Sequence, residues 1–361
     1  MNSLRIKSKI CDYDVFFQED YSFLKKLSNE TNHAVILDRN VYHLYKEIIS
    51  SNFKMDNVYL FDAIEENKSL KKISEIYDYL IQLSAKRNTV IICIGGGITQ
   101  DVTGFIASTL YRGMRWIFVP TTFLAQTDSC IGGKTALNYK TFKNLIGTFY
   151  PPAEIYINTK FLKTLTKNDF YSGMGEVIKL QLMKQDCPRD INKIIDFVGR
   201  AKLDYDFILE LIRDNLQVKI SYMLDDEFDH GSRNLLNYGH CFGHALETTS
   251  GYYIPHGIAV NIGMIFANSL SLRRGMLKEG VFRQVTSQLN LKNIPLELRK
   301  EHFDYEKLLD CMRADKKRTG ENLTVIIPDE KFWFFKISDV TETEFANALD
   351  DLKNILFSKL C

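Results

Sequence analysis

The first half of the chain alternates short apolar runs with helical patterns, and this alternation limits the possible folds more than any other feature. The runs are rich in β-branched residues and short enough to be strands buried on both faces. Stretches such as Ser69–Leu83, which lie between the runs, have helical periodicity. The alternation predicts βαβ units on a mostly parallel sheet. The candidate strands are Ala34–Asp38, Val58–Asp62, Val90–Ile94, Trp116–Val119 and Glu154–Ile157.

From about Asp169 onward, long amphipathic helical patterns replace this alternation. Only Leu323–Ile327 and Phe332–Lys336 resemble strands there, and they suggest one hairpin. A chain of 361 residues is also long for a single core. We therefore expect a boundary within residues 160–168, with an α/β domain over residues 1–165 and a mainly α-helical domain over residues 166–361. The clearest helical patterns of the second half are Asp206–Met223, Gly239–Thr249 and Ala259–Arg273.

Composition argues against several classes of partner. A formal net charge of +1 gives no reason to expect nucleic acid or a membrane surface as the main partner. The 7 cysteines are scattered and contain no CxxC pair, which favours a reducing compartment. The first residues are charged and have no apolar core, and no apolar stretch is long enough to span a membrane. The sequence predicts a cytoplasmic protein.

Three of the 7 histidines lie in one short window of the second half. His240 and His244 are four residues apart, which puts both imidazoles on one face of a helix, and His256 follows soon after. Histidine is the commonest metal ligand, and its ordinary pKa lies near neutrality. The window therefore suggests a metal-centred or proton-handling site. A set of hydrogen-bonded helix histidines is the alternative that the window alone leaves open.

Glu176 and Lys179 are spaced as neighbours on a predicted helix. On spacing alone, a surface ion pair is the ordinary interpretation. The flanking residues are apolar, however, which would bury both charges, and buried charges need partners or a metal. Glu176 with His240 and His256 would make a His₂Glu set of the kind found in catalytic zinc sites, although spacing does not prove that the three meet.

Three consecutive glycines, Gly95, Gly96 and Gly97, follow the strongest strand candidate and precede a helical pattern with Asp101 in its expected first turn. Glycine lets the backbone approach a phosphate closely, and a helix N-terminus offers unpaired N–H donors. The segment lacks the GxGxxG pattern of dinucleotide sites. A plain tight turn is the alternative.

The segment from Pro120 to Gly147 is rich in groups that bind anions. Gly132 and Gly133 precede Lys134 in an arrangement similar to phosphate-binding glycine-lysine loops, and Lys143 and Asn144 follow. The pattern predicts an anion site on this segment, and an ordinary solvated loop is the alternative. Several other cations suit phosphate or carboxylate, although each taken singly fits a solvated surface: Arg112, Lys219, Arg233, Lys316 and Lys317.

Together, these segments resemble the 3-dehydroquinate synthase family of sugar-phosphate cyclases. The resemblance runs from about Val35 to Ile327 and is strongest over Gly95–Asp101, Pro120–Gly147, Gly173–Lys179 and Arg233–Gly257. It implies an N-terminal NAD-binding α/β domain, a C-terminal α-helical metal-binding domain and an active site between them.

The resemblance also implies roles for individual residues. The family's zinc (or cobalt) ligands match Glu176, His240 and His256. Residues around the substrate match Asp128, Lys179, Lys219, Arg233, Asn237 and His244. The phosphate clamp matches Lys134, Asn144 and one of Lys316 or Lys317, and Arg112 matches an arginine that reaches in from a partner subunit, which implies a homodimer. The NAD contacts match Asp38, Asn40, Glu65, Lys68, Gly95, Gly96, Gly97, Asp101, Thr121, Thr122, Asp128, Lys134, Lys143, Phe161 and Thr164.

Some positions depart from the usual pattern of the family. Thr99-Gln100 stands where Ile-Gly is common, which bears on the pyrophosphate contact. Ile64 replaces a glycine before the Glu65/Lys68 pair. Ile258 replaces a common glutamate after His256-Gly257, which removes one support of the metal ligands.

The resemblance implies conversion of 3-deoxy-D-arabino-heptulosonate 7-phosphate into 3-dehydroquinate and phosphate, by transient oxidation with NAD, β-elimination, re-reduction and aldol closure. The alternatives are a related cyclase acting on sedoheptulose 7-phosphate, glucose 6-phosphate or an amino analogue, a metal-dependent polyol dehydrogenase, and a non-catalytic binding homologue. Arg233, Asn237 and His244 favour the carboxylated substrate, because a guanidinium suits a carboxylate.

Overall fold

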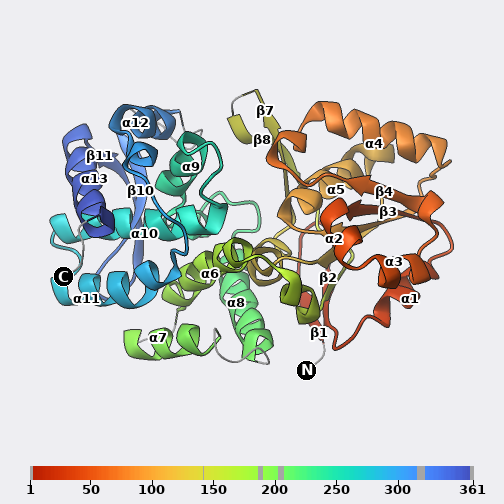
Figure 1. The fold of residues 1–361 in the computed structure, drawn as a ribbon, viewed down its shortest axis with the longest axis horizontal. Helices are drawn as coiled ribbons and strands as arrows, with labels where there is room; N and C mark the ends of the chain where they lie inside the picture. The colour runs from red at the N-terminus through yellow and green to blue at the C-terminus, as the bar shows by residue number, and fades with distance from the viewer. Residues whose placement is uncertain (1–2, 141, 186–189, 202–206, 315–321, 358–361) are drawn as a thin grey trace. The chain divides into compact units, whose positions relative to one another are not determined.

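The computed structural model describes residues 3–140, 142–185, 190–201, 207–314 and 322–357. The chain forms two compact units, Met1–Leu165 and Thr166–Cys361 (Figure 1). Met1–Leu165 is called unit 1 and Thr166–Cys361 unit 2.

Unit 1 is built on a seven-stranded sheet of order β1-β2-β9-β6-β5-β3-β4. β1 pairs with β2 in antiparallel register, and the other neighbours are parallel. The mostly parallel sheet expected from the alternation is confirmed. Its strands are β1 (Ser3–Ile6), β2 (Tyr13–Phe17), β3 (His33–Asp38), β4 (Val58–Phe61), β5 (Val90–Gly95), β6 (Trp116–Pro120) and β9 (Glu154–Ile157).

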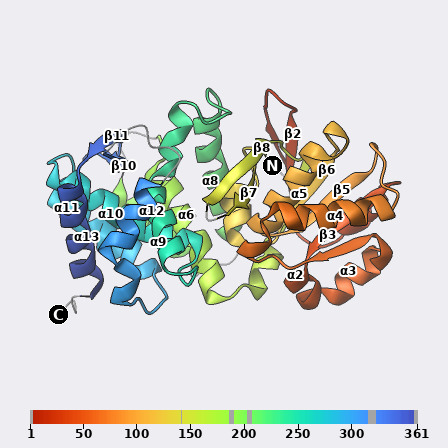
Figure 2. The ribbon, with the colours of Figure 1, turned by 90° about the horizontal axis from the view of Figure 1, so that it is seen from above.

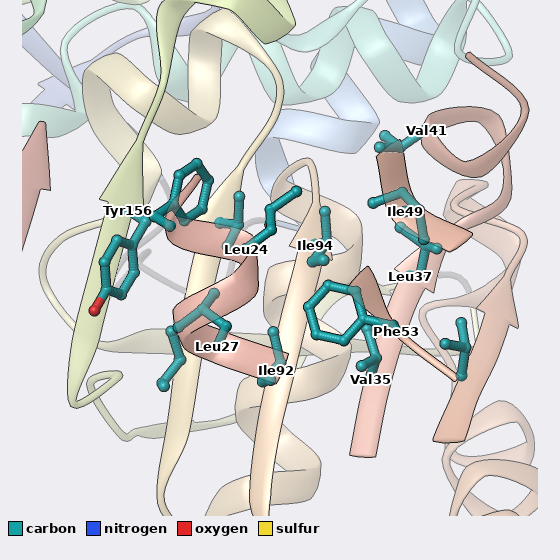
Figure 3. Close-up of a cluster of buried hydrophobic side chains, with 14 of the residues drawn as sticks. Leu24, Leu27, Val35, Leu37, Val41, Ile49, Phe53, Ile92, Ile94 and Tyr156 are labelled. Atoms are coloured by element: carbon teal, nitrogen blue, oxygen red, sulfur yellow. The ribbon is translucent and has the colours of Figure 1, made fainter. Parts of the chain in front are cut away.

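The central strands are buried on both faces because helices cover each side. On one face, Val35 and Ile92 pack with Leu24 and Ile49 from the first helices, as Figure 3 shows. On the other face, the fifth helix approaches so closely that a Cβ at Gly104 would lie 3.2 Å from the Trp116 ring. Apolar side chains on both faces explain why these strands read as continuous apolar runs. The helices are α1 (Phe23–Ser28), α2 (Arg39–Leu44), α3 (Lys46–Asn52), α4 (Leu70–Gln82) and α5 (Gly97–Thr109).

The segment after β6 that is expected to bind anions forms a π-helical turn, η4 (Ala125–Ser129), followed by a β-hairpin of β7 (Lys134–Tyr139) and β8 (Phe142–Phe149). This hairpin was not among the candidate strands predicted from the sequence. Gly132 and Gly133 precede the hairpin with φ of 100° and 63°, conformations that glycine adopts without strain. Thr135 and Leu137 of β7 point inward and are buried. The rest of the hairpin mixes polar and apolar residues, and no residue of β8 is buried, so no clear alternation marked the hairpin in the sequence.

Unit 2 is mainly helical, as expected, with one antiparallel hairpin of β10 (Leu323–Pro328) and β11 (Phe334–Val340). Its central helix, α10, is buried along almost its whole length because it is apolar on all sides, and α9 and α12 lie next to each other in both views (Figure 2). The helices are α6 (Lys167–Leu182), α7 (Ile191–Arg200), α8 (Phe207–Met223), α9 (His240–Thr249), α10 (His256–Arg273), α11 (Glu279–Val285), α12 (Tyr305–Arg313) and α13 (Glu342–Phe357). Within the described ranges, no helix has the length and apolar character needed to cross a membrane.

Candidate functional site

Three helices of unit 2 carry the residues expected to bind metal. Glu176 lies in the middle of α6, His240 and His244 lie in the first turns of α9, and His256 is the first residue of α10. Gly239 precedes α9 with a left-handed φ of 77°, which lets the chain turn sharply into the helix. The helix starts therefore place the imidazoles where the middle of α6 can meet them.

One carboxylate oxygen of Glu176 faces two of the imidazoles. Glu176 Oε1 lies 3.5 Å from His240 Nε2 and 3.2 Å from His256 Nε2. Tetrahedral zinc with bonds of about 2.1 Å to nitrogen and oxygen keeps its ligand atoms about 3.4 Å apart. The three predicted ligands therefore converge with the spacing that a small divalent cation needs.

The opposite nitrogens of the two imidazoles are fixed by other acceptors. His240 Nδ1 lies 3.1 Å from the carbonyl oxygen of Tyr238, and His256 Nδ1 lies 2.9 Å from Glu247 Oε2. Because a carbonyl and a carboxylate only accept hydrogen bonds, they favour the proton on Nδ1. Both Nε2 atoms lie on the side of Glu176, and a cation bound there would replace the proton on Nε2 of His256, which gives the arrangement usual for metal-binding histidines.

His244 lies beside the same group. Its ring centroid is 5.3 Å from that of His240 and 5.5 Å from that of His256. One nitrogen from each of the three rings lies within 4.8 Å of the others. A cation here has Glu176 and three imidazoles within reach. The choice of Glu176, His240 and His256 as ligands, with His244 left for proton handling, stays a prediction.

Lys179 sets the electrostatics of this group. It forms an ion pair with Glu176, and both side chains are buried, as their apolar neighbours predicted. Burial and the charge of Lys179 hold the pKa of His240 well below its ordinary value, so this imidazole is neutral. Burial also disfavours charge on His256, but Glu247 and Glu176 outweigh it and raise the pKa of His256 to about 10.

Two glycines let the ligand-bearing helices α6 and α10 approach each other. A Cβ at Gly175 would lie 1.8 Å from the carbonyl oxygen of Gly257, and a Cβ at Gly257 would lie 1.7 Å from that of Ser172. The Gly257 N–H also donates to Ser172 Oγ at 3.0 Å. Because Gly175 and Gly257 adjoin Glu176 and His256, this backbone contact fixes the separation of the two ligands.

A tight turn before α9 presents Arg233. The Asp226 carboxylate accepts the backbone N–H groups of His230 at 2.8 Å, Gly231 at 2.7 Å and Arg233 at 2.9 Å. The Arg233 guanidinium, which is buried, donates to the carbonyl oxygen of Glu227. Partial burial opposes ionisation, but the backbone donors lower the pKa of Asp226 below its ordinary value. Asp226 therefore organises the backbone around Arg233.

The remaining substrate residues expected in unit 2 occupy separate elements. Lys219 is buried on α8. Asn237 ends the 3₁₀ turn η6 (Ser232–Asn237), where its side chain donates to the carbonyl oxygen of Asn234 at 2.7 Å. Lys316 and Lys317 lie outside the described residues.

A second polar cluster lies in unit 1. The Lys68 ammonium, only 5% exposed as a residue, lies 2.7 Å from Asp101 Oδ2 and 2.5 Å from Asn144 Oδ1. Burial raises the pKa of Asp101 although Lys68 opposes this shift. Asn138 Oδ1 accepts the Asn144 N–H at 2.9 Å, and its amide donates to Glu65 Oε1 at 2.8 Å. The cluster joins residues that the sequence assigned to NAD with one assigned to phosphate.

Most of the other residues predicted to contact NAD lie at or after the ends of strands of the unit 1 sheet. Asp38 accepts the N–H of Asn40 at 2.8 Å at the start of α2. Gly97 begins α5, and Asp101 lies just past the first turn, not inside it as expected. Further residues expected to contact NAD lie at or after the ends of β5, β6 and β9, or beside Glu65: Gly95, Gly96, Thr121, Thr122, Phe161, Thr164 and Lys143.

Gln100, one of the residues that depart from the usual family pattern, connects two elements of unit 1. Its amide nitrogen donates to the carbonyl oxygen of Ser129 at 2.7 Å, and its amide oxygen accepts from Ser129 Oγ at 2.7 Å. These two bonds attach α5 to η4, the turn that carries Asp128.

Two residues predicted to bind anions are exposed. They are Lys134 at the start of β7 and Arg112 in η3 (Leu110–Arg112).

Sequence reasoning assigned no role to Glu247, Asp226, Gln100 or Asn138. Glu247 lies seven residues after His240, so helical periodicity, which puts it on the same face as His240 and His244, was a usable signal for a carboxylate beside the imidazoles. The partners of the other three depend on tertiary contacts, and spacing along the chain carried no sign of them.

The family model described as 3-dehydroquinate synthase N-terminal matches residues 58–172, and the model described as 3-dehydroquinate synthase C-terminal matches residues 173–318. The 3-dehydroquinate synthase of Clostridium tetani is 36% identical over 343 residues, covering 93% of this chain and 88% of that protein. The one of Streptococcus pyogenes serotype M3 is 32% identical over 364 residues, covering 97% of this chain and 99% of that protein.

Solved structures with the same fold include other sugar-phosphate cyclases. A 2-epi-5-epi-valiolone synthase from Streptomyces hygroscopicus with NAD⁺ and Zn²⁺ bound has a TM-score of 0.83 at 23% identity, covering 97% of this chain and 99% of that one. A 2-deoxy-scyllo-inosose synthase complexed with carbaglucose-6-phosphate, NAD⁺ and Co²⁺ has a TM-score of 0.79 at 23% identity, with the same coverage. An iron-containing alcohol dehydrogenase from Corynebacterium glutamicum, 13% identical and covering 94% of each chain, has a TM-score of 0.60.

Proposed function

This chain belongs to the 3-dehydroquinate synthase family, and from that premise we propose that it converts 3-deoxy-D-arabino-heptulosonate 7-phosphate into 3-dehydroquinate and phosphate. In this reaction the enzyme is a phosphate-eliminating carbon–oxygen lyase. The observation that carries the proposal is the convergence of Glu176 Oε1 with His240 Nε2 at 3.5 Å and His256 Nε2 at 3.2 Å. The scattered cysteines support the further proposal that it works in the cytoplasm.

The proposed cofactors are NAD and a divalent cation, Zn²⁺ or Co²⁺, which the related cyclase structures contain. The residues of this chain fit the cation, because neutral His240 and a buried carboxylate are suitable donors. When bound, NAD⁺ supplies transient oxidation of a ring alcohol, and the cation supplies Lewis-acid polarisation of oxygen. Glu176, His240 and His256 would hold the cation.

The remaining residues bind, orient and move protons. Lys179 forms a buried ion pair with Glu176 and would position its carboxylate. His244, beside both predicted histidine ligands, would exchange a proton at one of its ring nitrogens. We assign the substrate carboxylate to Arg233, since a guanidinium matches its geometry. Lys219, Asn237 and Asp128 would orient the sugar hydroxyls, and Lys134 and Asn144 would bind the phosphate.

The test is a substrate panel with the purified full chain, NAD⁺ and Zn²⁺ or Co²⁺. The heptulosonate phosphate should release phosphate with no net NADH, because the hydride returns to the substrate. A matched His256→Ala variant should release none. Phosphate release from sedoheptulose 7-phosphate or glucose 6-phosphate alone would assign the chain to another cyclase activity. Net NADH from an unphosphorylated polyol would identify a dehydrogenase instead.

A further inference from the structure

Glu247 is a buried carboxylate beside the candidate metal centre. It lies in the last turns of α9 and is 4% exposed, and its Oε2 lies 2.9 Å from His256 Nδ1. We propose that Glu247 is a positioning residue of the metal centre, which orients His256 and keeps its proton on Nδ1 so that Nε2 binds the cation. This inference rests on the metal site of the proposed function.

His256 is held at both nitrogens by carboxylates from two different helices. Nε2 lies 3.2 Å from Glu176 Oε1 on α6, and Nδ1 lies 2.9 Å from Glu247 Oε2 on α9. The ring orientation is therefore defined by two fixed points. The Nδ1 of His240 has a neutral backbone carbonyl as its partner instead. Of these two imidazoles, only His256 has a carboxylate beside its Nδ1. A negatively charged partner raises the basicity of a histidine ligand more than a neutral carbonyl does.

The backbone around Glu247 is anchored, which makes it a rigid support. Its carbonyl oxygen accepts the Tyr252 N–H at 2.9 Å and the Ser250 hydroxyl at 3.1 Å, closing the turn after α9. Position 258 on α10 holds a buried isoleucine, which has no group that could accept a hydrogen bond from a histidine. The carboxylate that supports His256 in this chain therefore comes from α9.

The experiment measures Co²⁺ binding to the metal-free full chain by competition with a chelator, without NAD or substrate. Glu247→Ala should weaken Co²⁺ binding about 10- to 100-fold, the usual cost of losing such a support. Glu247→Gln keeps a hydrogen-bond acceptor without the charge and should lose less. Thr248→Ala is the matched control, since Thr248 is the exposed next residue and bonds the carbonyl oxygen of His244 within the helix. It should bind like the wild type.

The visible spectrum of bound Co²⁺ separates positioning from a general effect on folding. We expect both Glu247 variants to change this spectrum while the circular dichroism of the metal-free proteins stays as in the wild type. Wild-type affinity and spectrum in Glu247→Ala would overturn the inference. If that variant does not fold, wild-type affinity and spectrum in Glu247→Gln would overturn it.

Two further outcomes separate this inference from the proposed reaction. A wild-type chain that binds no Co²⁺ overturns the metal site and this inference together. A chain that binds Co²⁺ with the expected dependence on Glu247, yet does not convert the heptulosonate phosphate, overturns the proposed reaction alone.

Discussion

Asp226 shows how one carboxylate can shape a binding segment without facing a ligand itself. Its oxygens accept three backbone N–H groups within the turn that ends at Arg233. A carboxylate bound to several backbone donors replaces the water that those donors would otherwise need. The position of Arg233 therefore depends on the charge of Asp226.

Asp226→Asn should lower the free energy of unfolding by about 1 kcal/mol at neutral pH, because an amide oxygen accepts these bonds less strongly than a carboxylate. The pKa of Asp226 is lowered in the folded protein. The ionised group therefore stabilises fully above its unfolded pKa of about 3.9, and the effect is lost as pH falls through the lower folded pKa. Urea unfolding of wild type and variant across this pH range measures the difference.

Asp225→Asn is the control for that measurement, because Asp225 is the exposed neighbour. A difference between wild type and Asp226→Asn that persists unchanged below the folded pKa would contradict the charge argument.

Residues whose partners lie nearby in sequence were the predictable part of the site. Glu176 and Lys179 lie within one turn of the same helix, and their apolar neighbours in the sequence indicated that both are buried. Glu247 was not predictable in the same way, because its partner His256 begins a different helix. Which side chains meet across helices is decided by tertiary packing, and a single sequence does not record it.

The crossing of α6 and α10 is the structural element on which the proposed metal site depends. Gly175→Ala would put a Cβ 1.8 Å from the Gly257 carbonyl oxygen, so the helices must separate. Glu176 and His256 are the adjacent residues and would move apart. We expect Co²⁺ affinity to fall at least about 10-fold and the thermal midpoint to drop, since both effects follow from a forced shift of packed backbone.

Gly199→Ala on α7 is the matched control. No atom lies within 4 Å of its added Cβ, so the change should stabilise the helix by up to about 1 kcal/mol and leave Co²⁺ binding unaltered. Equal Co²⁺ affinity in Gly175→Ala and Gly199→Ala would show that the close approach does not set the ligand spacing.

Elements with continuous apolar runs or long amphipathic patterns were predicted correctly, and the hairpin of β7 and β8 was not. β3 and α8 follow directly from their residues. β2 was missed although Tyr13, Val15 and Phe17 alternate inward, because the signal is short. β7 and β8 mix polar and apolar side chains, and no residue of β8 is buried, so neither a continuous apolar run nor a clean alternation marks them.

At the scale of the whole molecule, the chain keeps its two polar clusters in separate compact units. The cluster around Lys68 belongs to Met1–Leu165, and the one around Glu176 belongs to Thr166–Cys361. The formal net charge of +1 offers little long-range attraction for an anionic substrate. Recognition of the proposed sugar phosphate would therefore come from such local clusters.

The proposed homodimer adds a contribution between subunits, because Arg112 is expected to act in the partner's site. Arg112 is exposed in η3, where its φ is 60°. Arg112→Ala and His256→Ala should each be inactive as homodimers. If Arg112 acts across the interface, a mixed dimer of the two variants has one site with both groups intact. Random exchange of equal amounts gives half mixed dimers, so about a quarter of wild-type activity should return.

The measurement is phosphate release from the heptulosonate phosphate after the two variants are unfolded and refolded together. Sedimentation of the mixture establishes that dimers have formed again. Each variant refolded alone is the control, and its activity should stay at background. If Arg112 serves its own subunit, every site of the mixed dimer lacks one of the two groups. Background activity in refolded dimers would therefore place Arg112 outside the partner's site.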